Sequence, residues 1–506
     1  MGLSEIFGGG FMVPKRCKIT RLGREFSVSD LNFWFNLKEK SIHHNVDTLY
    51  YNVYLKDDTE NIPPGSLVNL FNLLDSTKEK MLNDKITNVW FDEENGILFT
   101  TRSFRNYKYC ISKPGYFDIF FLPRLINSST PRIHVQLRSI GLWQLGTYQS
   151  LEDSFRFIKD LLSSYDVQVD KTVENRIDYC YHTNYFQNLQ TLYSDDNVVN
   201  HLYTTFRLGQ KIFNLNYRSL KTETFNLGNK KSNNLFFRSY NKIREVIEEN
   251  YKGFFLDYWL SLGLINQYDY YVYSKCYSKS SYSYKYAAMM EFYIEYGNDD
   301  FVKELFRNSL VDTNQTSDSL KKLVRGILPE PTLIINVEYQ TMRKFYYYSD
   351  ELIDRLPILH NCTSELLRLY QVLDNRKIFL DYLNHEVVCF VKDKNVKKKD
   401  FVCIPFWKAL QSVKLISACD ADFKRDYSSK KDLDSLVSRI LSSTATLNIY
   451  LNKVDTNFAD DLDTLINILN DNDLIPESVS NKRYDIIKEK KKMALKSILS
   501  RPSGND

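Results

Sequence analysis

The chain has 506 residues, too many for one ordinary hydrophobic core, so two or three domains are expected. Its 43% hydrophobic and 26% charged residues are typical of a globular protein, and no apolar run of about 18 residues predicts a membrane span. The net charge of +4 is too small to indicate a nucleic-acid partner by itself. Eight scattered cysteines without a Cys-x-x-Cys pair argue against a zinc site or a disulfide scaffold and favour a reducing compartment.

The first part of the chain predicts a mixture of strands and helices. Residues 1–45 are expected to form an irregular arm, with a glycine run at 8–10. Strands are predicted where β-branched and aromatic residues gather, and helices where apolar residues recur every three or four positions. The predicted strands cover residues 46–54, 87–91, 96–101, 107–121, 130–139 and 174–182. The predicted helices cover residues 67–82 and 149–164, and another begins at residue 185.

The second part continues with strands and then becomes helical. A strand pair is predicted over 224–245 and a strand over 332–345, with helices over 251–264 and 301–310. Residues 287–296 fit a strand or a short helix, and helical patterns dominate from 349 apart from a β-like passage over 385–404. This order predicts an α+β fold with a central antiparallel sheet and helices on one face. The expected parts are an arm (1–45), a main domain (46–350), an extension or second subdomain (351–415) and a helical, basic C-terminal region (416–506).

The strand pair over 224–245 carries the most informative residues. Its second strand contains Arg238, Tyr240 and Lys242 at alternating positions, so the three side chains are expected on one face. A tyrosine between two cations suits attack on a phosphate, because the cations stabilise the phenolate and neutralise the phosphate. The same three residues also fit a plain basic strand face.

Basic residues concentrate around this tyrosine. Residues 207–245 contain nine Lys or Arg against two Glu, and further basic clusters cover 394–399 and 482–496. Such runs are often solvated loops or helix faces, but the first one surrounds the candidate nucleophile. The side chains expected to contact DNA phosphates are Arg207, Arg218, Lys230, Lys231 and Arg244.

Four further polar residues on predicted strands are candidate ligands for a divalent metal, which prefers oxygen donors or imidazole. The candidates are Asp47, His134, Gln136 and Asp178. His134 and Gln136 are two apart and share a strand face, although a lone strand histidine is often a satisfied, partly buried side chain. Asp178 is explained equally well by an ion pair with Arg176 or Arg138.

The order of these segments resembles the Rep_trans (replication initiation factor) family of rolling-circle replication initiators and relaxases, which are relatives of the HUH nucleases. The resemblance covers roughly residues 45–350. It rests on the strand Arg176-Ile177-Asp178 and on Gly228-Asn229-Lys230-Lys231-Ser232 followed by Arg238-Ser239-Tyr240-Asn241-Lys242.

The resemblance implies a metal-dependent enzyme that nicks one strand of origin DNA. Tyr240 would attack the phosphodiester and leave a covalent 5′-phosphotyrosine and a 3′-hydroxyl primer, with Arg238 and Lys242 as the cations and Mg²⁺ or Mn²⁺ as the cofactor. Glu338 and Glu291 compete for the family's later strand glutamate, and Glu338 is favoured by the basic residues that follow it. The implied partners are single-stranded or cruciform origin DNA, a host helicase and a second copy of the chain, without a membrane, in the bacterial cytoplasm.

Other functions remain open or are disfavoured. A non-catalytic origin-binding protein on the same scaffold and a conjugative relaxase both fit the pattern. Tyr346 or Tyr347, beside Arg343 and Lys344, offers another tyrosine next to cations. A tyrosine recombinase needs a His-x-x-Arg pair and a P-loop helicase needs Gly-x-x-x-x-Gly-Lys-Ser/Thr, and the sequence contains neither motif.

Overall fold

The computed structural model places one compact unit over residues 1–424 and a second unit from residue 425 onward. The residues that the structure describes are 16–21, 24–29, 31–36, 40–58, 63–125, 130–187, 189–193, 200–206, 213–218, 221–229, 234–249, 252–296, 328–347, 349–421 and 423. The predicted helix over 301–310 and nearly all of the predicted C-terminal region over 416–506 lie outside this set. No helix in the described part combines the length and the apolar character needed to cross a membrane.

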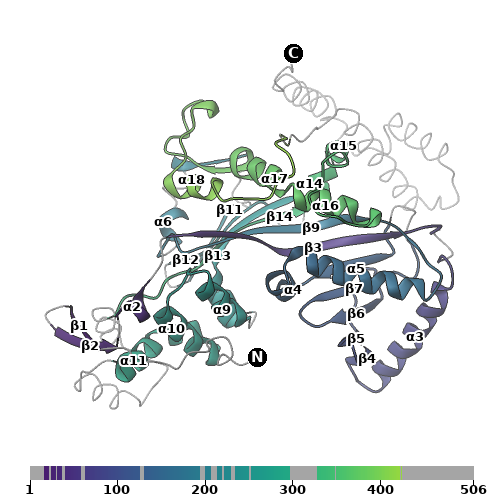
Figure 1. Ribbon diagram of the computed structural model, residues 1–506, viewed down its shortest axis with the longest axis horizontal. Helices are drawn as coiled ribbons and strands as arrows, with labels where there is room; N and C mark the ends of the chain where they lie inside the picture. The colour runs from purple at the N-terminus through teal and green to yellow at the C-terminus, as the bar shows by residue number, and fades with distance from the viewer. Residues whose placement is uncertain are drawn as a thin grey trace, which may run out of the picture. The chain divides into compact units, whose positions relative to one another are not determined.

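Eleven strands of the described chain form one antiparallel sheet in the order β11-β12-β13-β14-β9-β3-β8-β7-β6-β5-β4 (Figure 1). Their bounds are β3 Ile42–Leu55, β4 Asn88–Asp92, β5 Ile97–Thr100, β6 Tyr109–Lys113, β7 Phe117–Phe121, β8 Ile133–Leu137, β9 Val169–Thr183, β11 Phe213–Arg218, β12 Lys221–Leu227, β13 Leu235–Asn241 and β14 Ile335–Met342. The two longest strands, β3 and β9, pair at the centre, and β14 and β13 follow on one side. The sheet therefore brings together side chains that are hundreds of residues apart in the sequence.

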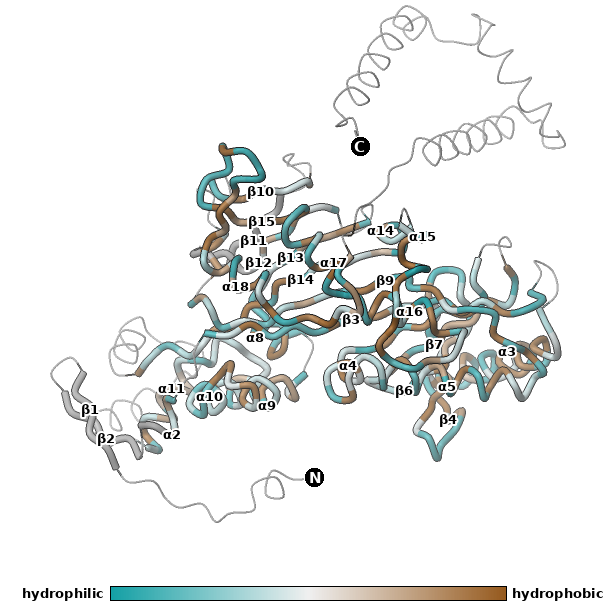
Figure 2. The backbone as a smooth tube through the Cα atoms, turned by 45° about the horizontal axis from the view of Figure 1, so that its top comes forward, coloured by the Kyte–Doolittle hydropathy of each residue, from teal (hydrophilic) through white to brown (hydrophobic). Residues whose placement is uncertain are grey.

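Two small strand pairs lie outside this sheet. They are β1 (Arg16–Arg21) with β2 (Arg24–Ser29), and β10 (Leu202–Thr204) with β15 (Val388–Phe390). The loop that follows β15 is mostly hydrophilic, as Figure 2 shows, and it carries the predicted basic cluster over 394–399.

The sequence of β9 gives the sheet an aromatic face and a polar face. Ile177, Tyr179 and Tyr181 alternate with Asp178, Cys180 and His182, and successive strand residues point to opposite faces. On the aromatic face the Tyr179 hydroxyl lies 3.1 Å from that of Tyr346, and the Tyr181 hydroxyl accepts a hydrogen bond from the Asn384 amide. Helices α5 (Thr147–Ser163), α14 (Arg343–Tyr347), α16 (Leu367–Asp374) and α17 (Arg376–Tyr382) cover this face (Figure 1).

Helices also reach the polar face at one end of the sheet. The His182 ring stacks on Trp143 of α4 (Ser139–Gln144) with 4.5 Å between ring centroids, and its Nδ1 accepts a hydrogen bond from the indole of Trp259. Trp259 belongs to α9 (Phe254–Ser261), which Figure 1 shows below the sheet together with α10 (Gln267–Ser278) and α11 (Lys285–Tyr296). The α+β class with a large antiparallel sheet is confirmed, but helices pack on both faces and not on one.

Most of the predicted elements in the first part agree with the structure, and the departures are local. The helices predicted over 67–82 and 149–164 are α3 (Leu67–Asn83) and α5. The ambiguous segment 287–296 is helical and forms α11. The remaining described α-helices are α2 (Leu31–Phe35), α6 (Gln190–Tyr193), α8 (Lys242–Arg244), α15 (Asp350–Ile353) and α18 (Pro405–Gln411).

Candidate functional site

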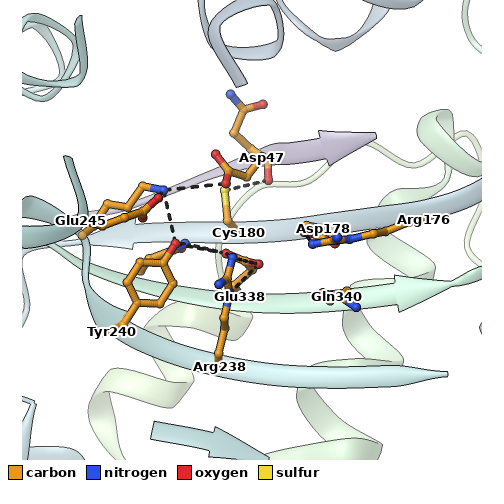
Figure 3. Close-up of polar contacts among 12 residues, drawn as sticks. Asp47, Arg176, Asp178, Cys180, Arg238, Tyr240, Glu245, Glu338 and Gln340 are labelled. Carbon is orange, nitrogen blue, oxygen red and sulfur yellow. Dashed lines mark hydrogen bonds and ion pairs between the residues drawn. The ribbon is translucent and has the colours of Figure 1, made fainter. Parts of the chain in front are cut away.

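The register of three neighbouring strands assembles a polar cluster on the sheet (Figure 3). Arg238 of β13 lies opposite Glu338 of β14, and Tyr240 lies opposite Asn336. Glu338 in turn lies opposite Cys180 of β9. Because residues two apart on a strand share a face, all five side chains lie on the polar face.

The hydroxyl of Tyr240 faces polar groups and not apolar packing. It donates a hydrogen bond to Glu338 Oε2 at 3.3 Å, and it accepts one from the Asn336 amide at 2.9 Å. The Lys242 ammonium donates a third hydrogen bond to it at 3.3 Å. The residue is 8% exposed. Burial and the Glu245 carboxylate raise the pKa of Tyr240 well above its ordinary value, although the charges of Lys242 and Arg238 act to lower it. The resting phenol is therefore protonated.

Glu338 holds Arg238 in a two-pronged ion pair. The guanidinium donates from Nε to Oε1 at 2.8 Å and from Nη2 to Oε2 at 3.0 Å. It also lies 4.9 Å from the centre of the Tyr240 ring. Burial raises the pKa of the Glu338 carboxyl. The charge of Arg238 lowers this pKa in part, and the carboxylates of Asp178 and Asp47 raise it further. Glu338 is thereby a better proton acceptor than an ordinary carboxylate.

Lys242 is a fully buried cation between two carboxylates. Its Nζ lies 2.8 Å from Glu245 Oε2 and 3.7 Å from Asp47 Oδ2. Burial lowers the pKa of this ammonium, but Asp47 and Glu245 outweigh burial and hold the pKa well above its ordinary value. Lys242 was predicted on the strand, but it begins α8, because the side chain of Asn241 caps that turn by accepting from the Arg244 amide at 3.1 Å.

The four predicted metal ligands do not converge on one point. Asp47 accepts a hydrogen bond from the Trp143 indole at 2.9 Å in addition to its pair with Lys242. Asp178 is held by Arg176, whose Nε donates to it at 2.8 Å, which was one of the two explanations weighed from the sequence. Across the described ranges, no group of three or more His, Cys, Asp or Glu side chains is arranged to hold a metal.

His134 lies in an aromatic environment on β8. Its ring stacks on Phe104 at 5.0 Å, and its Nδ1 is 2.8 Å from the side-chain oxygen of Asn52. Gln136 Nε2 lies 3.3 Å from the other ring nitrogen. Burial, with a smaller contribution from Arg105, lowers the pKa of His134 to about 3. Both ring nitrogens therefore already have protein partners, and the ring stays neutral.

The predicted DNA-contacting residues are only partly described. Arg207, Lys230 and Lys231 lie outside the described residues, and Arg218 is on β11 with its side chain outside them. Arg244 is described: its Nε donates to Glu248 at 2.8 Å, and its guanidinium lies 5.5 Å from the centre of the Tyr282 ring.

The residues that the sequence offered as alternatives to Glu338 and Tyr240 lie outside the polar cluster. Glu291 is on helix α11 and pairs with Lys275 at 3.2 Å, so Glu338 is the glutamate that lies on a strand of the main sheet. Tyr346 is buried on the aromatic face with its hydroxyl 2.7 Å from that of Thr341. Tyr347 is 48% exposed on α14.

Several contributors were not predicted as site residues. Asn336 precedes Glu338 by two positions and shares its strand face, and Glu245 follows Lys242 by one helical turn, so these spacings are the signals that could have identified both residues. Trp143 and Lys252 come from distant segments, and no sequence signal connects them to Asp47.

Comparisons with known proteins give little further support. No family model matches the chain, and no curated protein matches it by sequence. A solved structure of a rolling circle replication initiator protein from Geobacillus stearothermophilus matches over 73% of this chain and 96% of that chain, with a TM-score of 0.33 and 13% sequence identity. Because this similarity is too low to assign a function, the side chains of the site must supply the evidence.

Proposed function

We propose that the chain nicks one strand of DNA by attack of Tyr240 on a phosphodiester, as an initiator of rolling-circle replication. The observation that carries the proposal is the surroundings of the Tyr240 hydroxyl. One cation, one amide and one carboxylate lie within 3.3 Å of it, on a face formed by neighbouring strands of the sheet. A phenol needs such neighbours to act as a nucleophile, because an isolated phenol has a pKa near 10.

The proposed step transfers a phosphoryl group to the protein. Glu338 takes the phenolic proton, the phenolate oxygen forms a bond to phosphorus, and the bond from phosphorus to the 3′ oxygen breaks. The 3′ oxygen leaves with the electron pair and takes up a proton, which gives a free 3′-hydroxyl and a 5′-phosphotyrosine. Lys242 stabilises the phenolate before attack, and Arg238 supplies positive charge beside the developing phosphorane.

The requirement for Mg²⁺ or Mn²⁺ stays a prediction. The four side chains proposed as ligands from the sequence do not fit a common ion, so no step above is assigned to a metal. A nicking assay with and without a chelator, followed by addition of each metal, measures the requirement directly.

The test is nicking of a supercoiled plasmid that carries the coding region and its flanks. The wild-type protein is expected to convert this plasmid to the open circular form, and Tyr240→Phe is expected to abolish the conversion. Tyr347→Phe is the matched control, because this exposed tyrosine also follows basic residues but lies on α14. Undiminished nicking by Tyr240→Phe would rule out Tyr240 as the nucleophile.

A non-catalytic DNA-binding protein is the second candidate. It is favoured by the small exposed fraction of Tyr240, 8%, and by the raised pKa that keeps its phenol protonated. In that case the polar cluster holds the strands together, and the wild-type protein binds the plasmid but leaves it supercoiled. The plasmid assay separates the two functions in one experiment.

A further inference from the structure

A cleft of about 720 Å³ opens on the polar face beside the tyrosine site. It is lined by residues of β3, β4, β5, β6, β7 and β8 and by the start of α4. Asp47 and Lys252 belong to its lining, and Asp47 is also 3.7 Å from the Lys242 ammonium that contacts Tyr240. The cleft therefore adjoins the candidate nucleophile through a shared residue.

Two arginines share one buried carboxylate in this cleft. Asp118 is 3% exposed and accepts from Arg102 Nη2 at 2.5 Å, from Arg138 Nε at 2.7 Å and from Ser112 Oγ at 2.6 Å. One carboxylate neutralises one guanidinium, so the group keeps a net positive charge. The side chains of Arg102 and Arg138 are 50% and 36% exposed, which leaves N–H donors accessible to a ligand.

An aromatic ring completes the set of groups in the cleft. Tyr50 of β3 lines it, and the Arg176 guanidinium lies 5.2 Å from the centre of the Tyr50 ring. Figure 3 shows Arg176 and Asp178 together on β9, the strand next to that of Glu338, and Tyr50 pairs with Arg176 where β3 lies beside β9. Proteins bind single-stranded DNA with such a combination of phosphate-binding cations and an aromatic side chain for a base.

We propose that this cleft binds one nucleotide of the single strand whose neighbouring phosphodiester is presented to Tyr240, a role that rests on the proposed function. Arg102 and Arg138 bind the phosphate as paired N–H donors, and Tyr50 packs against the base. The cleft volume lies in the range of about 300–1,000 Å³ that is usual for small-ligand sites and suits one nucleotide. The lining contains three cations and two carboxylates, with Lys252 and Asp47 at the end near Tyr240. Its net charge of +1 matches the single negative charge of a phosphodiester.

The test measures binding of a fluorescent single-stranded oligonucleotide from the flanks of the coding region, with every variant made in a Tyr240→Phe background so that no covalent product forms. Arg102→Ala is expected to weaken binding roughly tenfold and to reduce the slope of log K against log salt by about 0.7. Arg156→Ala is the matched control, because Arg156 is a 65% exposed arginine on α5 that pairs with Asp153 at 3.3 Å. It is expected to bind like its parent.

Further measurements show whether the variant is folded and whether the cleft binds a phosphate, a base or duplex DNA. Asp118 keeps Arg138 and Ser112 when Arg102 is removed, and an unchanged thermal unfolding midpoint shows that Arg102→Ala is folded. Tyr50→Leu is expected to weaken binding of the intact oligonucleotide several-fold more than binding of an abasic one. Equal binding by Arg102→Ala and Arg156→Ala overturns the proposal, as does stronger binding of duplex DNA than of the single strand.

The outcome is distinguishable from failure of the proposed nicking. If wild-type protein binds the oligonucleotide through Arg102 and Tyr50 but never nicks, the cleft is a single-strand site and the catalytic role of Tyr240 is wrong. For nicking, Arg102→Ala, Tyr50→Leu and Arg156→Ala are also made with Tyr240 intact. If the wild-type protein nicks and the two cleft variants nick and bind as well as the Arg156→Ala control, the cleft proposal is wrong and the nicking proposal stands.

Discussion

Replacement of Lys242 by methionine tests the electrostatics of the site most sharply. The side chain is fully buried, and its Nζ lies 2.8 Å from Glu245 and 3.7 Å from Asp47. Methionine keeps most of the apolar stem but removes the charge, which leaves two carboxylates without this cation. Breaking a buried ion pair by removing one partner costs about 3–5 kcal/mol, so we expect the free energy of unfolding at neutral pH to fall by that amount.

The pH dependence of this loss follows from the direction of the pKa shifts. Lys242 lowers the pKa of Asp47 and of Glu245 against the effect of burial. A carboxyl whose pKa is lower in the folded state than in the unfolded state stabilises the fold at pH values above its unfolded-state pKa, which is near 4. This stabilisation is lost as the pH falls through the folded-state pKa. The difference in stability between wild type and Lys242→Met is therefore expected to be full at pH 7 and to shrink below about pH 4.

The assay is urea unfolding followed by tryptophan fluorescence at several pH values. Lys275→Met is the control, because Lys275 is 42% exposed and its pair with Glu291 is a surface ion pair worth about 0–1 kcal/mol. If Lys242→Met loses no more stability than Lys275→Met, or if its loss is independent of pH, the assignment of Lys242 as a buried cation between two carboxylates is wrong.

Three further predictions concern the chemistry of the site. Glu338→Gln is expected to lower the nicking rate at least about 100-fold because the proton acceptor is lost, and a rate near wild type in single-turnover kinetics would refute that role. His134→Phe is expected to keep nicking activity and its metal dependence, since the ring packs on Phe104; a changed response in a metal titration would instead assign His134 to a metal. The nicking rate is expected to rise between about pH 7 and pH 9, because the raised pKa of Tyr240 keeps the phenol protonated at neutral pH, and a falling pH–rate profile would contradict this.

Local sequence patterns predicted the part of the site that lies on one strand. Arg238 and Tyr240 share a face because the alternation of side chains in a strand is fixed by covalent geometry. Glu338 was predicted on a strand because β-branched and aromatic residues gather around it. The alternation did not extend to Lys242, because the cap made by Asn241 ends the strand one residue earlier.

The remaining groups depend on contacts between distant segments. A register irregularity of β3 lies between Val46 and Thr48, at Asp47, and such irregularities re-aim side chains. The spacing of His134 and Gln136 suggested a pair of metal ligands. In the structure the His134 ring instead stacks on Phe104, which comes from a distant loop. The two arginines on Asp118 meet only when β5, β7 and β8 align, and no motif connects them.

The most direct test of the central claim is mass spectrometry of the protein after incubation with DNA from the coding region and its flanks. If Tyr240 is the nucleophile, one tryptic peptide containing Tyr240 carries an oligonucleotide linked through a 5′-phosphate, and Tyr240→Phe carries none. Attachment to another tyrosine, or nicked DNA with no linked peptide, contradicts the claim.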